Sequence, residues 1–141
     1  MAQRDTRTGS VLEQMVMPAL ERGGYRSKTQ VYVGRRPGGR KQKVDVVAQD
    51  RDGRHILISL KWQQTSGTAE QKVPFEVICL AEAVSADKNG QTRAYLVLGG
   101  SGWTLRDFFT GGGLEAHLKN ARLVKILALE SFVARANKGD L

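Results

Sequence analysis

Apolar residues follow two different periods along this chain, and each period predicts a different kind of element. Near the N-terminus, Ser10 and Glu13 fit a capping box before apolar residues at helical spacing, and Gly23 and Gly24 end that helix. Shorter apolar runs predict strands that are separated by polar turns such as 50–53. The predicted strands are 25–33, 44–48, 56–62, 94–98 and 123–129, and the further helical segments are 70–86, 105–109, 114–120 and 131–137.

The order of these elements is α-β-β-β-α-β-α-β-α. Early strands form hairpins and later strands alternate with helices, so we expect an α/β fold in which helices flank a mixed central sheet. Pro18 is expected to kink or break the first helix, and Pro74 to delay the start of the second. Ser131 is expected to cap the last helix.

Length and composition restrict the class of protein. The chain has 141 residues, of which 40% are hydrophobic and 26% charged, as in an ordinary globular domain. Cys79 is the only cysteine, so neither a disulfide scaffold nor a zinc site is expected. No apolar run approaches the roughly 20 residues that span a bilayer, and residues 1–10 contain no apolar signal core. We therefore expect a cytoplasmic protein without a membrane partner, whose residues 1–8 are flexible.

The positive charge is concentrated in one segment. The chain carries 22 Lys and Arg against 14 Asp and Glu, a net charge of +8. Eight of the basic residues and no acid lie in 22–43: Arg22, Arg26, Lys28, Arg35, Arg36, Arg40, Lys41 and Lys43. Such a segment is either a solvated loop or a polyanion-binding surface. Pro37 and five glycines argue against an amphipathic membrane helix, so nucleic acid is the favoured partner.

Two charged residues interrupt apolar strands. Alternation places Ser59, Lys61 and Gln63 on one face of their strand, and Asp45 lies among valines on the preceding strand. A lysine in such a strand either protects a sheet edge or has a function, and an Asp45–Lys61 ion pair is the simplest structural alternative.

The run KVDVVAQDRDGRHILISLKWQ resembles the core motif of the PD-(D/E)XK nuclease superfamily, with Asp45, Lys61 and Gln63 at the motif positions. The segment TRTGSVLEQ resembles the Gly-Ser-x-x-Glu signature of archaeal-type Holliday-junction resolvases, which adds Glu13. Two positions depart from the motif: Val44 replaces the proline, and Ser59 replaces the second acid.

The resemblance implies a restriction-endonuclease-like fold and a set of site residues. The implied catalytic residues are Glu13, Asp45, Lys61 and Gln63. A Mg²⁺ ion, for which Mn²⁺ can substitute, would be held by Glu13, Asp45 and the carbonyl of Leu60. Ser59 is a further candidate ligand, and Glu70 or Glu76 would replace the missing acid from the following helix. DNA would be held by a basic loop at 34–43, through Arg35, Arg36, Arg40, Lys41 and Lys43.

The implied function is metal-dependent hydrolysis of phosphodiester bonds in double-stranded or branched DNA by one nuclease domain spanning residues 1–141. The short chain fits a Holliday-junction resolvase-like enzyme best; a homing or restriction-type endonuclease is the alternative. The implied setting is a bacterial, archaeal or phage-infected cell. Because cutting both strands needs two sites, a homodimer or a dimer of dimers is expected. A non-catalytic DNA-binding module on the same fold is the alternative from another class.

Other features weigh less. Trp62 and Trp103 are expected to pack in the core or an interface rather than stack on bases. The Gly99–Gly102 run lacks a phosphate-loop signature, and we expect it to shape a groove or a subunit contact.

Overall fold

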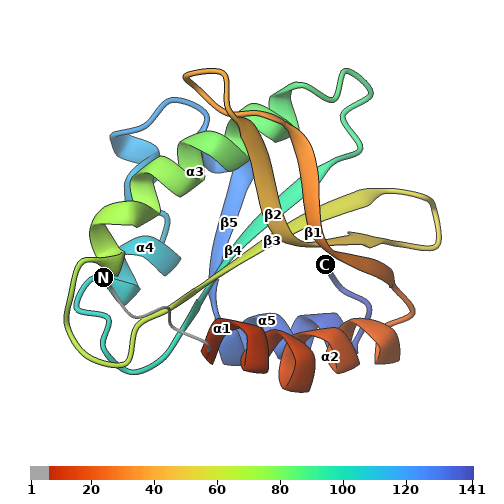
Figure 1. The fold of residues 1–141 in the computed structure, drawn as a ribbon, viewed down its shortest axis with the longest axis horizontal. Helices are drawn as coiled ribbons and strands as arrows, with labels where there is room; N and C mark the ends of the chain where they lie inside the picture. The colour runs from red at the N-terminus through yellow and green to blue at the C-terminus, as the bar shows by residue number, and fades with distance from the viewer. Residues whose placement is uncertain (1–6) are drawn as a thin grey trace.

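A five-stranded mixed sheet forms the centre of the molecule, with helices on both faces (Figure 1). The structure is a computed structural model that describes residues 7–141. The strands are β1 (Arg26–Arg35), β2 (Lys41–Gln49), β3 (His55–Trp62), β4 (Arg93–Gly99) and β5 (Val124–Ala128), in the spatial order β1-β2-β3-β4-β5. The predicted α/β class, the mixed sheet and the order of its elements are confirmed. The predicted flexibility of residues 1–8 falls outside the described residues except for Arg7 and Thr8, which lie in a helix.

The direction of each strand follows from the connection before it. Short turns join β1 to β2 and β2 to β3, and these pairs are antiparallel. Helical crossovers join β3 to β4 and β4 to β5, and these pairs are parallel. In the predicted turn between β2 and β3, the Asp50 carboxylate accepts hydrogen bonds from the backbone N–H groups of Asp52 and Arg54, at 2.9 Å each.

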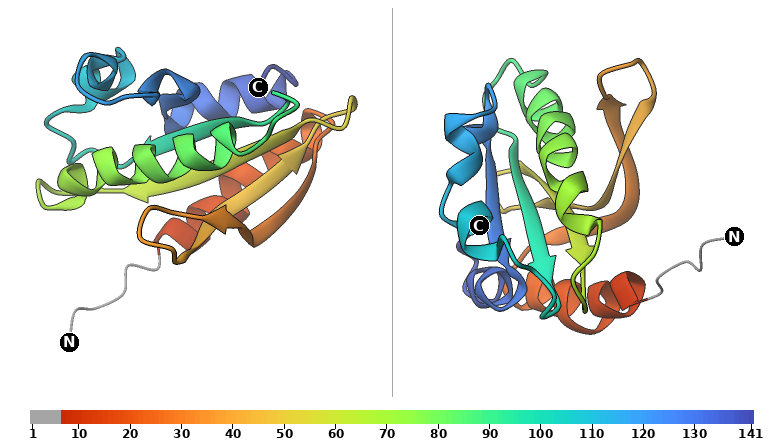
Figure 2. Two further views of the ribbon diagram at one scale, coloured as in Figure 1. Left: turned by 90° about the horizontal axis from the view of Figure 1, so that it is seen from above. Right: turned by 90° about the vertical axis from the view of Figure 1, so that its left-hand side faces the viewer.

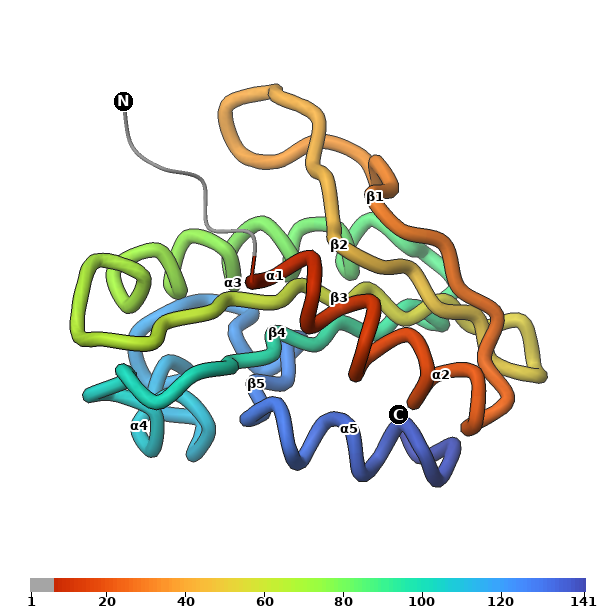
Figure 3. Tube along the Cα trace, turned by 60° about the horizontal axis from the view of Figure 1, so that its bottom comes forward, coloured from red at the N-terminus to blue at the C-terminus, as the bar shows by residue number. Residues whose placement is uncertain are grey.

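One face of the sheet is covered by the N-terminal helical segment and by α5 (Leu129–Asn137), which lie side by side (Figure 3). The N-terminal segment consists of α1 (Arg7–Val11), the π-helical turn η1 (Leu12–Val16) and α2 (Met17–Arg22). Pro18 does not break it, because the proline lies in the first turn of α2 and the wider π turn precedes it. Leu20 and Phe132 are fully buried between these helices and the sheet.

The opposite face is covered by α3 (Ala69–Ser85), with α4 (Arg106–Thr110) and the 3₁₀ turns η2 (Gly113–Ala116) and η3 (Ala121–Leu123) beside it (Figure 2). Val77 and Leu80 of α3 pack on Leu57 and Leu96 of the sheet.

Three local predictions on the helices were wrong. Pro74 lies inside α3 and does not delay its start. The segment 114–120 forms only short 3₁₀ structure. Finally, α5 begins at Leu129, so Ser131 is inside the helix and does not cap it.

The β1–β2 hairpin extends beyond the rest of the sheet beside α3 (Figures 2 and 3). Its strands reach Arg35 and start again at Lys41, so the loop is shorter than the predicted 34–43. The Arg36 N–H donates to the Arg40 carbonyl at 2.9 Å, and the Arg35 side chain donates to the Gly39 carbonyl at 2.7 Å. The register of the two strands shifts between Tyr32 and Arg35. Among the described helices, none has the length and apolar character that a membrane crossing requires.

Candidate functional site

Strands β2 and β3 separate at Asp45. Their ladder pairs Val47 with Leu57 and ends at Val46 with Ile58. Val46 packs on the α5 side of the sheet, whereas Val44 packs on the α3 side, so β2 twists sharply across Asp45. The Asp45 carboxylate accepts a hydrogen bond from the Leu60 backbone N–H at 2.7 Å. The carboxylate thus provides an acceptor for a β3 backbone group beyond the end of the regular ladder.

The surroundings of Asp45 disfavour its negative charge. Partial burial raises the pKa of its carboxyl above the ordinary value, and the nearby negative charge of Glu76 raises it further. The Leu60 hydrogen bond and the positive charges of Lys61 and Lys43 oppose this shift but do not cancel it. An additional cation beside Asp45 would therefore stabilise the ionised carboxylate.

Lys61 is half-buried on β3 and lies close enough to act on Asp45 electrostatically. Among residues 7–141, however, no ion pair within 4.0 Å joins the two side chains. The simple ion-pair alternative is therefore not what the structure shows, and the ammonium group remains available for a substrate.

Glu76 and Arg36 are two further charged residues near Asp45 and Lys61. Both act electrostatically on the buried thiol of Cys79, whose pKa is raised mainly by burial, and Lys61 acts on it as well. The Arg36 guanidinium lies over the Phe75 ring on α3, 5.9 Å from its centroid. Sequence reasoning named Arg36 only as part of a loop, because its approach to α3 depends on how the hairpin curves in space. We define the candidate site as Asp45, Lys61, Glu76 and Arg36.

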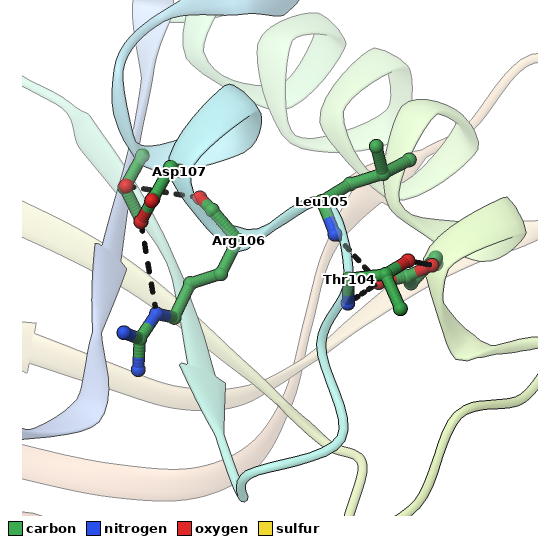
Figure 4. A network of polar contacts seen from close by, with 6 residues as sticks. Thr104, Leu105, Arg106 and Asp107 are labelled. Atoms are coloured by element: carbon green, nitrogen blue, oxygen red, sulfur yellow. Dashed lines mark hydrogen bonds and ion pairs between the residues drawn. The ribbon is translucent and has the colours of Figure 1, made fainter.

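Glu70 is used elsewhere. Its carboxylate accepts hydrogen bonds from the backbone N–H and the hydroxyl of Thr104 and from the backbone N–H of Leu105, the last at 2.9 Å (Figure 4). These donors, the Thr104 hydroxyl first, lower the pKa of Glu70. Of the two acids proposed to replace the missing one, Glu70 thus holds the loop before α4, and only Glu76 acts on Asp45.

The predicted ligand Glu13 lies on the N-terminal segment, across the sheet from α3, and its role stays a prediction. Glu13 is exposed on η1, whose segment covers the face opposite α3, and it is not among the charges that shift the pKa of Asp45. Across residues 7–141, no three or more His, Cys, Asp or Glu side chains form a group that could hold a metal ion. Asp45 and Glu76 are two carboxylates close enough for the charge of Glu76 to raise the pKa of Asp45.

Gln63 connects two loops. It is only 5% exposed, its side-chain N–H donates to the Gly102 carbonyl at 2.8 Å, and its side-chain oxygen accepts from the Ala69 N–H at 3.0 Å. A Cβ on Gly100 would collide with the Gln63 carbonyl, so the glycine permits this close approach. Gln63 therefore holds the 99–102 loop and the start of α3 in place, and we do not assign it a contact with the reacting groups.

Two further predicted positions lie within the framework. Ser59 is 3% exposed on β3 and faces the α3 side with Lys61, although it offers no carboxylate. Trp103 is buried, and its ring N–H donates to the Gly99 carbonyl at 2.8 Å. Trp62 is partly buried and packs on the α5-side core.

The basic segment does not form a single patch. Arg26 pairs with Gln49 at one end of β1, and Arg35 pairs with Lys41 at the other. Arg22 donates a hydrogen bond to the Asn137 side chain at 2.6 Å, at the end of α5. Arg26 and Lys28 lie toward one end of the hairpin, whereas the residues predicted to bind DNA lie toward its loop end: Arg35, Arg36, Arg40, Lys41 and Lys43.

Comparison with known proteins agrees with this geometry. A family profile described as "PD-(D/E)XK nuclease superfamily domain" matches residues 4–140. The chain belongs to the PD-(D/E)XK nuclease superfamily. The resemblance to this superfamily that the sequence suggested is thereby confirmed. A comparison with curated proteins found no match.

Solved structures also resemble the chain. An XisH family protein from Nostoc punctiforme PCC 73102 has a TM-score of 0.54 at 18% identity, over 86% of this chain and 94% of its own. A repair endonuclease from Pyrococcus abyssi has a TM-score of 0.44 at 15% identity, over 89% of this chain and 47% of its own. The EndoMS-dsDNA2 complex has a TM-score of 0.41 at 18% identity, over 90% and 46%. The chain therefore spans about half the length of the Pyrococcus abyssi repair endonuclease and of the EndoMS chain, and the XisH likeness concerns the fold.

Proposed function

We propose that this PD-(D/E)XK domain is a Mg²⁺-dependent endodeoxyribonuclease that selects branched DNA, as a Holliday-junction resolvase does. The observation that carries the proposal is the Asp45 carboxylate at the opening between β2 and β3, with Lys61 and Glu76 beside it. A carboxylate pair with a lysine beside it at this point of a nuclease fold fits metal-assisted hydrolysis of a phosphodiester bond.

The residues present fit Mg²⁺. This ion keeps several waters and is usually bound by one or two carboxylates together with substrate phosphates. Asp45 and Glu76 supply two carboxylates, and the Leu60 carbonyl and the Ser59 hydroxyl are further oxygen donors on the adjoining strand. The raised pKa of Asp45 also fits a site whose ionised form is completed by a cation. Mn²⁺ is expected to substitute because it accepts the same oxygen ligands.

Each residue then has a separate task. A bound Mg²⁺ would neutralise charge on the scissile phosphate and make an attacking water more acidic. Asp45 and Glu76 would hold the ion, and the Leu60 N–H fixes the position of the Asp45 carboxylate. Lys61, which has no ion-pair partner at Asp45, would orient the water or stabilise the negative charge that develops on the phosphate. This scheme does not draw on Glu13 or Gln63, whose catalytic roles stay predictions from the sequence.

The hairpin would bind the DNA backbone. Its arginines and lysines provide contacts to phosphates on either side of the cleaved bond, and arginine can bind a phosphate with two parallel hydrogen bonds. Arg36 is already held near the candidate site by its contact with Phe75. We propose a homodimer or a dimer of dimers as the active form, because cutting both strands requires two copies of the site.

One observation favours a second candidate function, a DNA-binding module without catalysis. Ser59 stands where the motif has an acid, and among residues 7–141 no group of three metal-ligating side chains was found. If Glu76 does not replace the missing acid, the domain would bind DNA through the hairpin without cutting it.

A cleavage panel separates these functions. The full chain is incubated with a four-way junction, a linear duplex and a single strand, each in Mg²⁺, in Mn²⁺ and in EDTA. We expect cleavage in both metals and not in EDTA, with the junction cut faster than the duplex. Equal cutting of the junction and of one particular duplex sequence would favour a restriction-type or homing endonuclease. Binding without cleavage in either metal would favour the non-catalytic module.

A further inference from the structure

Tyr32 presents its ring to solvent on the β1–β2 hairpin. It is 60% exposed, more than any other large hydrophobic side chain noted among residues 7–141. Its neighbours Val31 and Val33 pack toward the α3-side core, so alternation turns Tyr32 to the other face of the hairpin. No core packing therefore accounts for an aromatic ring at this position.

The ammonium groups of two lysines lie close to the Tyr32 ring. The ammonium group of Lys41 lies 5.5 Å from the ring centroid and that of Lys43 lies 6.0 Å from it. Lys43 is also the residue opposite Tyr32 in the β1–β2 ladder. An exposed aromatic face combined with positive charges is the combination that binds single-stranded nucleic acid, because the ring stacks on a base while the charges hold the backbone.

This aromatic surface adjoins the candidate site at Asp45, while Glu76 and Arg36 lie toward α3. Lys43 precedes Asp45 by two residues on β2 and is one of the charges that act on its carboxylate. Strand geometry puts the Cα atoms of Tyr32 and Asp45 about 8 Å apart. In a duplex, phosphates of one strand advance about 3.4 Å per nucleotide, so this separation amounts to a few nucleotides at most.

A stacking ring needs a base with an open face. In a continuous duplex, neighbouring base pairs cover both faces of every base, whereas a base at an interruption of the duplex can leave the stack at lower cost. An exposed tyrosine near the cleavage point therefore discriminates between continuous and interrupted DNA.

We propose that Tyr32 stacks on an unpaired base within a few nucleotides of the scissile phosphate, so that among branched DNAs the preferred substrate has unpaired nucleotides beside the cleavage point. This inference rests on the proposed nuclease function and specifies its substrate class. Lys41 and Lys43 then hold the phosphates that flank the stacked base.

The experiment compares variants of the full chain. Tyr32→Leu removes the aromatic face and keeps apolar bulk, and Tyr32→Phe keeps the face without the hydroxyl. Phe108→Leu is the matched control, because Phe108 is 42% exposed on α4. Binding is measured in EDTA with a fully paired duplex, a fully paired four-way junction and a duplex with three unpaired nucleotides. Cleavage of the same substrates is measured in Mg²⁺.

The wild-type chain, Tyr32→Phe and Phe108→Leu should prefer the substrate with unpaired nucleotides. Tyr32→Leu should lose at least about fivefold of this affinity, the lower end of what one base–aromatic stack contributes, and less than twofold on the paired duplex. A 2-aminopurine among the unpaired nucleotides should change its fluorescence with the wild type and not with Tyr32→Leu. Equal losses on paired and unpaired DNA, or a wild type without preference, would overturn the stacking proposal even if cleavage persists. Failure of every variant to bind or cut any DNA would instead overturn the proposed function.

Discussion

Asp45 should lower the stability of the metal-free protein while being required for cleavage. Its carboxyl has a raised pKa because partial burial removes the charge from water. Asp45→Asn removes that charge and keeps a side-chain oxygen that can accept the Leu60 N–H. We therefore expect this variant to be inactive and, in EDTA at neutral pH, at least as stable as the wild type.

The matched variant Asp45→Ala isolates the hydrogen bond. Alanine removes the charge too but leaves the Leu60 N–H without its acceptor, which costs about 1–3 kcal/mol. At roughly 3 °C per kcal/mol for a chain of this length, the Ala variant should melt about 3–9 °C below the Asn variant. In EDTA, the Asp45→Asn variant should therefore melt at or above the melting temperature of the wild type. The Asp45→Ala variant should melt below the Asp45→Asn variant.

Mg²⁺ should raise the melting temperature of the wild type relative to both Asp45 variants. A ligand at 100 times its dissociation constant stabilises the folded state by about 2.7 kcal/mol, which corresponds to roughly 8 °C here. The wild type should gain this stability in Mg²⁺, and neither Asp45 variant should. Thermal unfolding followed by near-ultraviolet circular dichroism, with and without Mg²⁺, measures each of these differences.

The dependence on pH tests the cause. An acid with a raised native pKa contributes stability that is complete below its unfolded value, near 3.8, and is lost as the pH rises through the native value. The stability difference between Asp45→Asn and the wild type should therefore shrink as the pH falls toward 3.8. An Asn variant less stable than the wild type in EDTA, by an amount that does not change with pH, would refute the argument from burial. Cleavage by Asp45→Asn at the wild-type rate would refute its place in the site.

Three further results are expected. Lys61→Ala should reduce cleavage by about 10²–10³-fold and leave DNA affinity nearly unchanged, because it removes one stabilising group from the transition state; a parallel loss of affinity would make it a binding residue instead. Glu76→Gln should raise the Mg²⁺ concentration needed for half-maximal cleavage, whereas Glu70→Gln should lower the melting temperature without changing that concentration; the reverse pattern would identify Glu70 as the ligand. DNA affinity should fall steeply with salt, and Lys41→Gln should reduce the slope of log affinity against log salt by about 1; an unchanged slope would remove Lys41 from the phosphate contacts.

The sequence predicts the fold better than it predicts the site. Apolar periods and turn residues were sufficient for the sheet and the order of its elements, because each strand is defined by its own neighbours in sequence. Asp45 and Lys61 were recognised for the same reason, since a charge in an apolar strand is conspicuous. The sequence does not predict that these two side chains form no direct ion pair, because their distance depends on the twist of β2 between Val44 and Val46.

The remaining site assignments depend on long-range geometry. Glu13 fits a local signature, but its helical segment packs on the face opposite α3. Glu70 and Glu76 look equivalent in the sequence, and only the position of the loop before α4 shows that Glu70 binds Thr104. Gln63 matches the motif while its two ends bind the backbone of Gly102 and Ala69. Each of these positions depends on how segments far apart in the sequence pack against one another, which a local motif does not show.

The two halves of the sheet differ in what a mutation in them would change. The parallel half, β3 to β5, is covered on one face by α3 and the α4 region and on the other by the N-terminal segment and α5, so substitutions there mainly affect whether the protein folds. The antiparallel β1–β2 hairpin is largely exposed and carries the charges and the free tyrosine. Its surface residues can therefore be exchanged at little cost in stability while the acid at its base stays in place. We expect a library of variants at the exposed positions of this hairpin to include proteins that cut differently shaped DNA. Its members should fold as readily as the wild-type chain.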